Sequence, residues 1–105
     1  MAITVFTKDN CRDCDRTKEI IDGKQIEYSV LNAQHDPEAF NFVVNTIGVK
    51  QMPVVIIHDG DWRDFRPEAG INTVDQPLCW SGLRYDRLVG LEALLEERES
   101  QSVAA

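Results

Sequence analysis

The sequence lacks the features that mark several large classes of protein. Its 105 residues include only three cysteines, an odd number with one close pair, which does not fit a secreted disulfide framework. No apolar run approaches the roughly 20 residues of a membrane-spanning helix. Residues 1–3 lead directly into an apolar segment, so we expect no signal peptide.

Positive charge is also scarce. Lysine and arginine number 11 against 18 acidic residues, and the net charge is −7. This balance argues against nucleic-acid binding, which requires a basic surface that neutralises phosphates. The length suits one domain with one core. We therefore expect a monomeric, cytoplasmic, single-domain protein with no nucleic-acid or membrane partner.

Two of the cysteines, Cys11 and Cys14, form a C-x-x-C motif. The motif directly follows the apolar run 3–6 and opens a segment with helical periodicity. At a helix N-terminus, backbone N–H groups and the helix dipole stabilise a thiolate, and a thiol three residues later lies on the same face. The pattern favours a redox couple in which Cys11 is the nucleophile and Cys14 resolves the mixed disulfide.

Two other interpretations of the pair stay open. A C-x-x-C motif can be half of a zinc or iron–sulfur site, but such a site needs further ligands. The rest of the chain offers only Cys79, His35 and His58, each by itself in the sequence. The pair can also be structural and chemically inert. We expect no metal, and we interpret Cys79 as a small buried residue.

Periodicity divides the chain into alternating strands and helices. The second strand is expected to bury Ile26, Tyr28 and Val30, and the second helix to bury a stripe from Phe40 to Ile47 that includes Val43 and Val44. We predict strands at 3–6, 26–31 and 52–57, and helices from Cys11 to about Asp22, from Asp36 to Gly48, and through the leucines at 88–95.

The segment at about 61–78 has no sustained period, and we interpret it as a loop insertion that begins with a short strand at 62–65. The order of elements around the C-x-x-C describes an α/β, thioredoxin-like fold. We expect a central mixed sheet of about four strands flanked by three helices. The domain is predicted to span residues 1–98, followed by a flexible tail at 99–105.

Three segments make the chain resemble the glutaredoxin-like NrdH redoxins, which have a thioredoxin fold. The first is 3–8 leading into the C-x-x-C, and the second is Met52-Pro53-Val54-Val55, similar to the strand that carries a cis proline in this superfamily. The third, 80–88, is close to the Trp-Ser-Gly-Phe-Arg-Pro-Asp segment that marks NrdH redoxins. The chain departs from the pattern at Arg12 and Asp13 between the cysteines, and at Leu83 and Tyr85.

The resemblance implies an electron donor for ribonucleotide reductase that thioredoxin reductase recycles. Electrons would come from NADPH through that reductase, with no bound cofactor. A cis Met52–Pro53 bond would present the Met52 backbone to a substrate strand. We place the partner contacts at Lys8, Arg12, Asp13, Met52, Pro53, Trp80, Ser81 and Gly82.

Three alternatives to this function remain. One is a glutathione-dependent glutaredoxin, although the glutathione-gripping turn looks replaced by Ser81-Gly82 and a bulky Leu83. The others are a noncatalytic metal or iron–sulfur carrier and an adaptor that uses the fold only to bind a partner. Whether the chain acts as an oxidoreductase or as an electron carrier does not follow from the motif, which both share.

Overall fold

A five-stranded sheet forms the centre of the molecule in a computed structural model, which describes residues 2–68 and 75–96. The strand order is β2-β1-β3-β5-β4; β1 and β2 are parallel, and the other neighbouring pairs are antiparallel. The strands are β1 (Ala2–Thr7), β2 (Ser29–Asn32), β3 (Val54–His58), β4 (Asp75–Gln76) and β5 (Cys79–Ser81).

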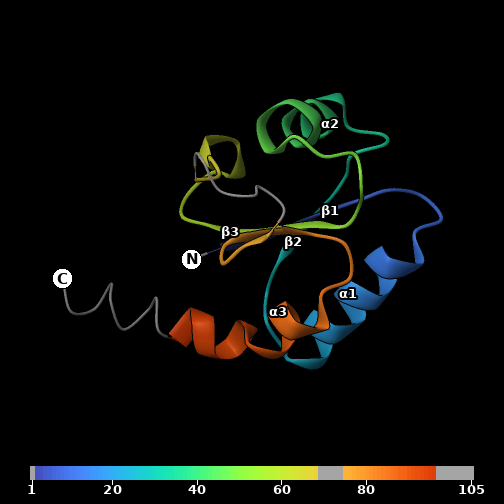
Figure 1. Cartoon of the computed structure of the whole chain (residues 1–105). Coiled ribbons are helices and arrows are strands. Elements are labelled where there is room, and N and C mark those ends of the chain that lie inside the picture. The colour runs from blue at the N-terminus through green and yellow to red at the C-terminus, as the bar shows by residue number, and fades with distance from the viewer. Residues whose placement is uncertain (1, 69–74, 97–105) are drawn as a thin grey trace.

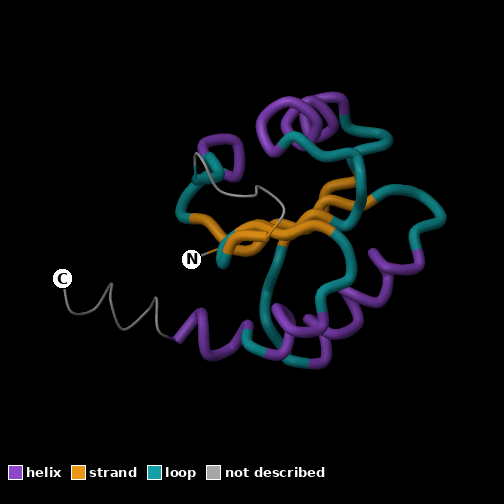
Figure 2. Tube along the Cα trace, viewed as in Figure 1, coloured by secondary structure: helices purple, strands orange, loops and turns teal. Residues whose placement is uncertain are grey.

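Helices cover both faces of this sheet, as Figures 1 and 2 show. One face carries α1 (Arg12–Gly23) and α3 (Tyr85–Val89). The other carries α2 (Pro37–Asn41), its continuation η1 (Phe42–Ile47) and the short helix η2 (Trp62–Asp64). The predicted α/β class and thioredoxin-like fold, with a mixed sheet between helices, are confirmed.

The apolar segments form two cores, one on each face of the sheet. All five residues of β3 are buried, because the strand lies between β1 and β5 and has helices on both faces. Because side chains alternate along a strand, those of Phe6 and Val54 point toward α2, and those of Val5 and Val55 point toward α1 and α3.

The second helix begins as predicted but buries a different stripe. The Asp36 carboxylate caps it by accepting from the N–H groups of Glu38 (3.0 Å) and Ala39 (3.2 Å). From Phe42 onward the turns are π-helical, and the helix ends at Gly48, whose φ is 88°. Phe42 lies in the core on the same helical face as Ala39 and Val43, whereas Phe40 is 51% exposed, so the prediction that Phe40 is buried was wrong.

The second strand is shorter than predicted and shows less burial. It begins only at Ser29 and forms an edge of the sheet, so Val30 is 43% exposed. Ile26 and Tyr28 precede the strand and pack against the α1 side of the core.

The strand predicted at 62–65 is absent, because Trp62–Asp64 is the 3₁₀ helix η2. Its Trp62 ring packs edge-on against Phe6 and Phe42 and anchors the insertion to the α2 core. On the side of β3 away from β1, the antiparallel neighbour is instead β5, and the insertion adds β4 at the sheet edge. β5 was not predicted, because a strand of three residues followed by a glycine is too short to show a period in the sequence.

The last helix buries the predicted leucines. Leu88 and Leu91 are buried, and Leu94 and Leu95 pack against the same core, although the helix breaks at Gly90 before resuming at 91–96. The predicted tail at 99–105 and the domain limit at 98 lie outside the described residues. Within the described part of the chain, no helix is both long and apolar enough to span a bilayer.

Candidate active site at the start of the first helix

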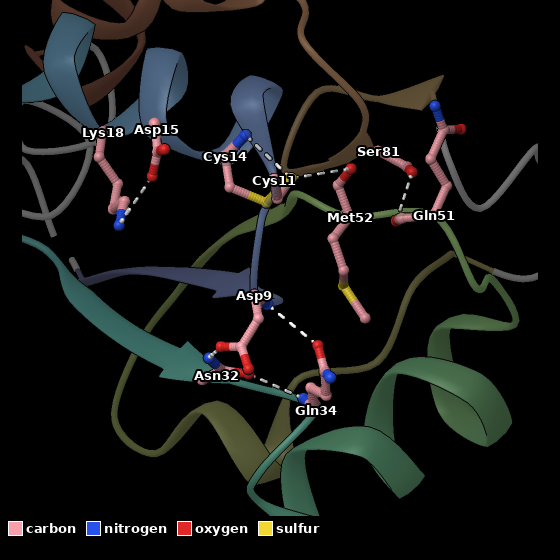
Figure 3. The surroundings of a disulfide bond; sticks show 10 residues. All are labelled: Asp9, Cys11, Cys14, Asp15, Lys18, Asn32, Gln34, Gln51, Met52 and Ser81. Carbon is pink, nitrogen blue, oxygen red and sulfur yellow. Dashed lines mark hydrogen bonds and ion pairs between the residues drawn. A yellow bond between two sulfur atoms is a disulfide. The ribbon is translucent and has the colours of Figure 1, made fainter.

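Cys11 and Cys14 form a disulfide at the N-terminus of α1 (Figure 3). Their Cα atoms lie 5.2 Å apart. Cys11 is the N-cap of the helix, and its Sγ accepts a hydrogen bond from the Cys14 N–H at 3.1 Å. The Cys11 side chain is 7% exposed and that of Cys14 is 1% exposed, so a partner reaches Cys11 more easily.

The helix start explains why this sulfur can carry charge. The first turn leaves backbone N–H groups without helical partners, and one of them already points at Cys11 Sγ. The same N–H would stabilise a thiolate after reduction of the disulfide. Asp13 and Asp15 occupy the first turn, where acidic residues complement the helix dipole.

The mouth of the site is an open cleft beside Cys11. It brings together Lys8, Arg12, Asp13 and Met52 from the predicted set with Asn10 and Gln51, which the sequence did not single out. Lys8, Arg12 and Asp13 are exposed, so cations and an anion surround the reachable sulfur. Their roles in partner binding stay predictions.

The proline segment lies directly against the nucleophile. The Met52–Pro53 bond is cis, as expected, and the Met52 carbonyl oxygen lies 3.9 Å from Cys11 Sγ. Two bonds from the third matching segment fix this stretch: Ser81 Oγ donates to the Gln51 carbonyl (3.0 Å), and the Gly82 N–H donates to the Pro53 carbonyl (2.8 Å).

A glycine is favoured at position 82 because of its backbone conformation. Its φ is 84°, in the left-handed region that side chains disfavour. Ser81 and Gly82 therefore act on the cleft by holding the segment 51–53.

The side chain of Trp80, which the sequence placed among the partner contacts, does not line the cleft beside Cys11. The indole is 1% exposed and packs with Val55, Leu88 and Leu91 on the α1 and α3 face. Cys11, Cys14 and Met52 belong to the core on the opposite face. The cause is strand alternation, since neighbouring residues of β5 point to opposite faces. The indole nitrogen has no hydrogen-bond partner among the described residues.

The remaining cysteine and one histidine are buried. Cys79 is completely covered, and burial raises the pKa of its thiol to about 11. His58 is buried and its Nε2 lies 2.8 Å from Thr4 Oγ1. Within residues 2–68 and 75–96, no three His, Cys, Asp or Glu side chains gather as metal ligands would.

A polar cluster before Cys11 was missed by sequence reasoning. Asp9 interacts with Asn32 at the end of β2 and with Gln34 and His35 in the loop that follows. The hydrogen bond to His35, with a further one from Asn32, lowers the pKa of the Asp9 carboxyl. The available signal was that polar residues follow two strands that a thioredoxin-like fold makes parallel neighbours.

Fold and site together define a class of protein. A disulfide at the N-terminus of the first helix, against a proline that opens the central strand of a thioredoxin-like sheet, is the arrangement of a dithiol redoxin. Comparison with known proteins narrows the class further.

The glutaredoxin family model matches residues 3–62. The glutaredoxin-like protein NrdH of Salmonella typhimurium (strain LT2) is 34% identical over 68 residues, which are 65% of this chain and 83% of that protein; the NrdH protein of Escherichia coli (strain K12) gives the same values. The structure of NrdH-redoxin from Escherichia coli superposes with a TM-score of 0.63 at 28% identity, covering 87% of this chain and 95% of that one. The chain belongs to the glutaredoxin family, as a glutaredoxin-like NrdH redoxin.

Proposed function

We propose that this redoxin donates electrons to ribonucleotide reductase and is recycled by thioredoxin reductase through the Cys11–Cys14 disulfide. One observation carries the proposal: the more reachable sulfur of the pair lies at a helix N-cap, in an open cleft, 3.9 Å from the Met52 carbonyl. The relatives named NrdH support the choice of client.

The chemistry is two successive thiol–disulfide exchanges. The Cys11 thiolate attacks a client disulfide, so a Cys11–client bond forms and one client sulfur leaves as a thiolate. The Cys14 thiolate then attacks Cys11 Sγ, which forms the intramolecular disulfide and releases the second client sulfur. Two electrons pass to the client, whose thiolates take up the two protons that Cys11 and Cys14 lost.

The site residues assist these steps in distinct ways. The Cys14 N–H donates to Cys11 Sγ and stabilises negative charge on it. The backbone of Met52, held by the bonds of Ser81 and Gly82 to its neighbours, offers a client strand a place to pair. Exposed Lys8, Arg12 and Asp13 add charge contacts at the mouth, which govern partner choice and association rate more than affinity.

Recycling by thioredoxin reductase restores the dithiol with two electrons from NADPH and two protons. The Escherichia coli relative is described as having a thioredoxin-like activity profile, which supports this reductant. In this chain Leu83, where a glutathione-gripping turn carries a polar residue, packs against the core on the α1 side. Leu83 therefore provides no polar group with which this turn could bind glutathione.

The source of electrons can be tested directly. Oxidised protein is mixed with NADPH and either thioredoxin reductase or glutathione with glutathione reductase, and NADPH consumption is followed. We expect fast consumption with thioredoxin reductase and poor turnover with glutathione. Cys11→Ser is the matched control, because it lacks the disulfide and should give no consumption. Reductases from several sources are needed, since Arg12 and Asp13 can alter recognition.

The client is tested in the same mixture by adding ribonucleotide reductase and a ribonucleotide. Deoxyribonucleotide should form with the wild type and not with Cys11→Ser. Glutathione-coupled turnover without any response to thioredoxin reductase would reassign the chain as a glutathione-dependent glutaredoxin. Inactivity with both reductants would favour an adaptor, and an absorbance band from an iron–sulfur cluster in the purified protein would favour a carrier.

A further inference from the structure

The loop that delivers Cys11 runs beside a second loop from the same end of the sheet. β1 and β2 are parallel, and Thr7 pairs with Asn32 at the end of their register. The Ala33 N–H continues the pairing with a bond of 2.8 Å to the Thr7 carbonyl. Because both strands end at this level, the segments 8–10 and 33–36 leave the sheet together.

Asp9 ties these two loops to each other. Its Oδ1 accepts from Asn32 Nδ2 at 2.9 Å, and its Oδ2 lies 2.5 Å from His35 Nε2. Its backbone N–H donates to Gln34 Oε1 at 3.0 Å. The Gln34 N–H in turn donates to Asn32 Oδ1 at 2.9 Å, which closes the set. We call these four residues the Asp9 clamp.

The clamp acts on the backbone and not on the sulfur itself. In Figure 3 the Asp9 side chain points toward Asn32 and Gln34 and away from the disulfide. Between Asp9 and Cys11 the chain passes through Asn10 with a φ of 55°, a left-handed conformation that local preference alone does not fix. An exposed loop of this kind needs outside contacts to hold one conformation, because ordering it costs entropy.

We propose that Asp9 and Gln34 are positioning residues for the Cys11 nucleophile. By tying the loop at 8–10 to the loop after β2, they hold Cys11 at the N-cap position where the Cys14 N–H donates to its sulfur. This inference rests on the proposed function, in which the Cys11 thiolate makes the first attack.

A charge effect of Asp9 would have the opposite sign. A carboxylate two residues from Cys11 disfavours a second negative charge, so its removal would make the thiolate easier to form. Loss of the clamp would instead misplace Cys11 and make the thiolate harder to form. Gln34 separates the two effects, because it is neutral and reaches the loop through a backbone N–H.

The test is the alkylation rate of Cys11 in the reduced, full-length protein, measured with iodoacetamide from about pH 6 to pH 10. Peptide mass spectrometry identifies the labelled cysteine. The variants are Gln34→Ala, Asp9→Ala and Asp9→Asn. Asn45→Ala is the matched control, since it removes an exposed amide whose hydrogen bond joins Asn45 of η1 to Asn41 of α2 and involves no residue of the clamp. Circular dichroism verifies that each variant is folded.

We expect Gln34→Ala and Asp9→Ala to slow alkylation at pH 7 by about threefold to tenfold and to match the wild type at pH 10, where the thiol is ionised in every variant. Asp9→Asn keeps an oxygen for Asn32 and should lose less than about twofold. Asn45→Ala should leave the rate unchanged.

Three results would each refute the positioning role of the clamp. They are a wild-type alkylation rate in Gln34→Ala, equal slowing of the variants at pH 7 and pH 10, and faster alkylation in both Asp9 variants. The assay contains no reductase and no client, so a failure of the clamp leaves the proposed function standing. A wild-type Cys11 that alkylates at pH 7 no faster than a small-molecule thiol would overturn both.

Discussion

Of the two variants Cys11→Ser and Cys14→Ser, the first should be the more stable and the second should keep more of the thiol–disulfide exchange activity. Cys11 caps α1 through its sulfur, and a serine hydroxyl is a good acceptor at an N-cap. Cys14 is 1% exposed and packs in the apolar core with Phe6 and Val54. A hydroxyl there must leave water for surroundings built from apolar side chains.

The magnitudes follow from these positions. Against the oxidised wild type, both variants lose a disulfide that closes only the loop 11–14, worth about 2 kcal/mol in the chain-entropy model. Against the reduced wild type, Cys11→Ser should change the free energy of unfolding by less than about 1 kcal/mol, since the cap remains. Cys14→Ser should lower it by about 1–3 kcal/mol, the cost of a buried hydroxyl that lacks a full set of partners.

Activity should fall in the reverse order. Cys11→Ser has no nucleophile and should show no insulin reduction, although it is the more stable variant. Cys14→Ser keeps the first exchange and should accumulate a Cys11–substrate mixed disulfide that mass spectrometry detects. Urea denaturation with a phosphine reductant, followed by circular dichroism, gives the stabilities. Dithiol-type turnover by Cys11→Ser, or failure of Cys14→Ser to trap a substrate, would refute the assigned roles.

Three further outcomes are expected. Cys79→Ala should change turnover by less than about twofold. Iodoacetamide at about pH 8 should not label Cys79 in the folded wild type, because the covered thiol with a pKa of about 11 stays protonated. Labelling of Cys79 at the rate of Cys11 would contradict this expectation. Trp62→Ala removes edge-on contacts with two phenylalanine rings and should lower the free energy of unfolding by about 2–4 kcal/mol in urea denaturation, with Cys11 alkylation unchanged. Burial, with the hydrogen bond to Asp22, raises the pKa of Tyr28 from 10.0 to about 12, so its contribution to stability is present below about pH 10 and is lost as pH rises toward 12. Tyr28→Phe should therefore flatten the decline in stability over that interval, and an unchanged slope would remove Tyr28 from the account.

Much of the fold and the redox pair could be read from local patterns. The run 3–6, the C-x-x-C and the stop near Gly23 predicted β1 and α1 closely, and Asp36-Pro37 placed the start of α2. These signals act within one strand or one helical turn, so they do not depend on the rest of the chain. The prediction that the Met52–Pro53 bond before β3 is cis came from the family resemblance and not from periodicity.

The errors fall where packing between elements overrides local pattern. Phe40 and Phe42 are both apolar, and only the choice of helical face packed against the sheet, the one with Ala39 and Val43, decides that Phe42 is buried. Trp62 has high strand propensity, but its ring is held in a 3₁₀ turn by contacts with Phe6 and Phe42. Trp80 matched a family segment, yet the face it occupies depends on the register of β5 against β3.

The sequence by itself determined the chemistry of the site: two thiols three residues apart at a strand-to-helix junction, with backbone N–H groups ready to stabilise the first as a thiolate. Only the tertiary structure decided what surrounds that thiol. The parallel register of β1 and β2 brings Asn32, Gln34 and His35 to Asp9, and the pairing of β5 with β3 brings Ser81 and Gly82 to the proline segment. Contacts between segments far apart in the chain follow from strand register and packing, because each segment alone is compatible with many partners.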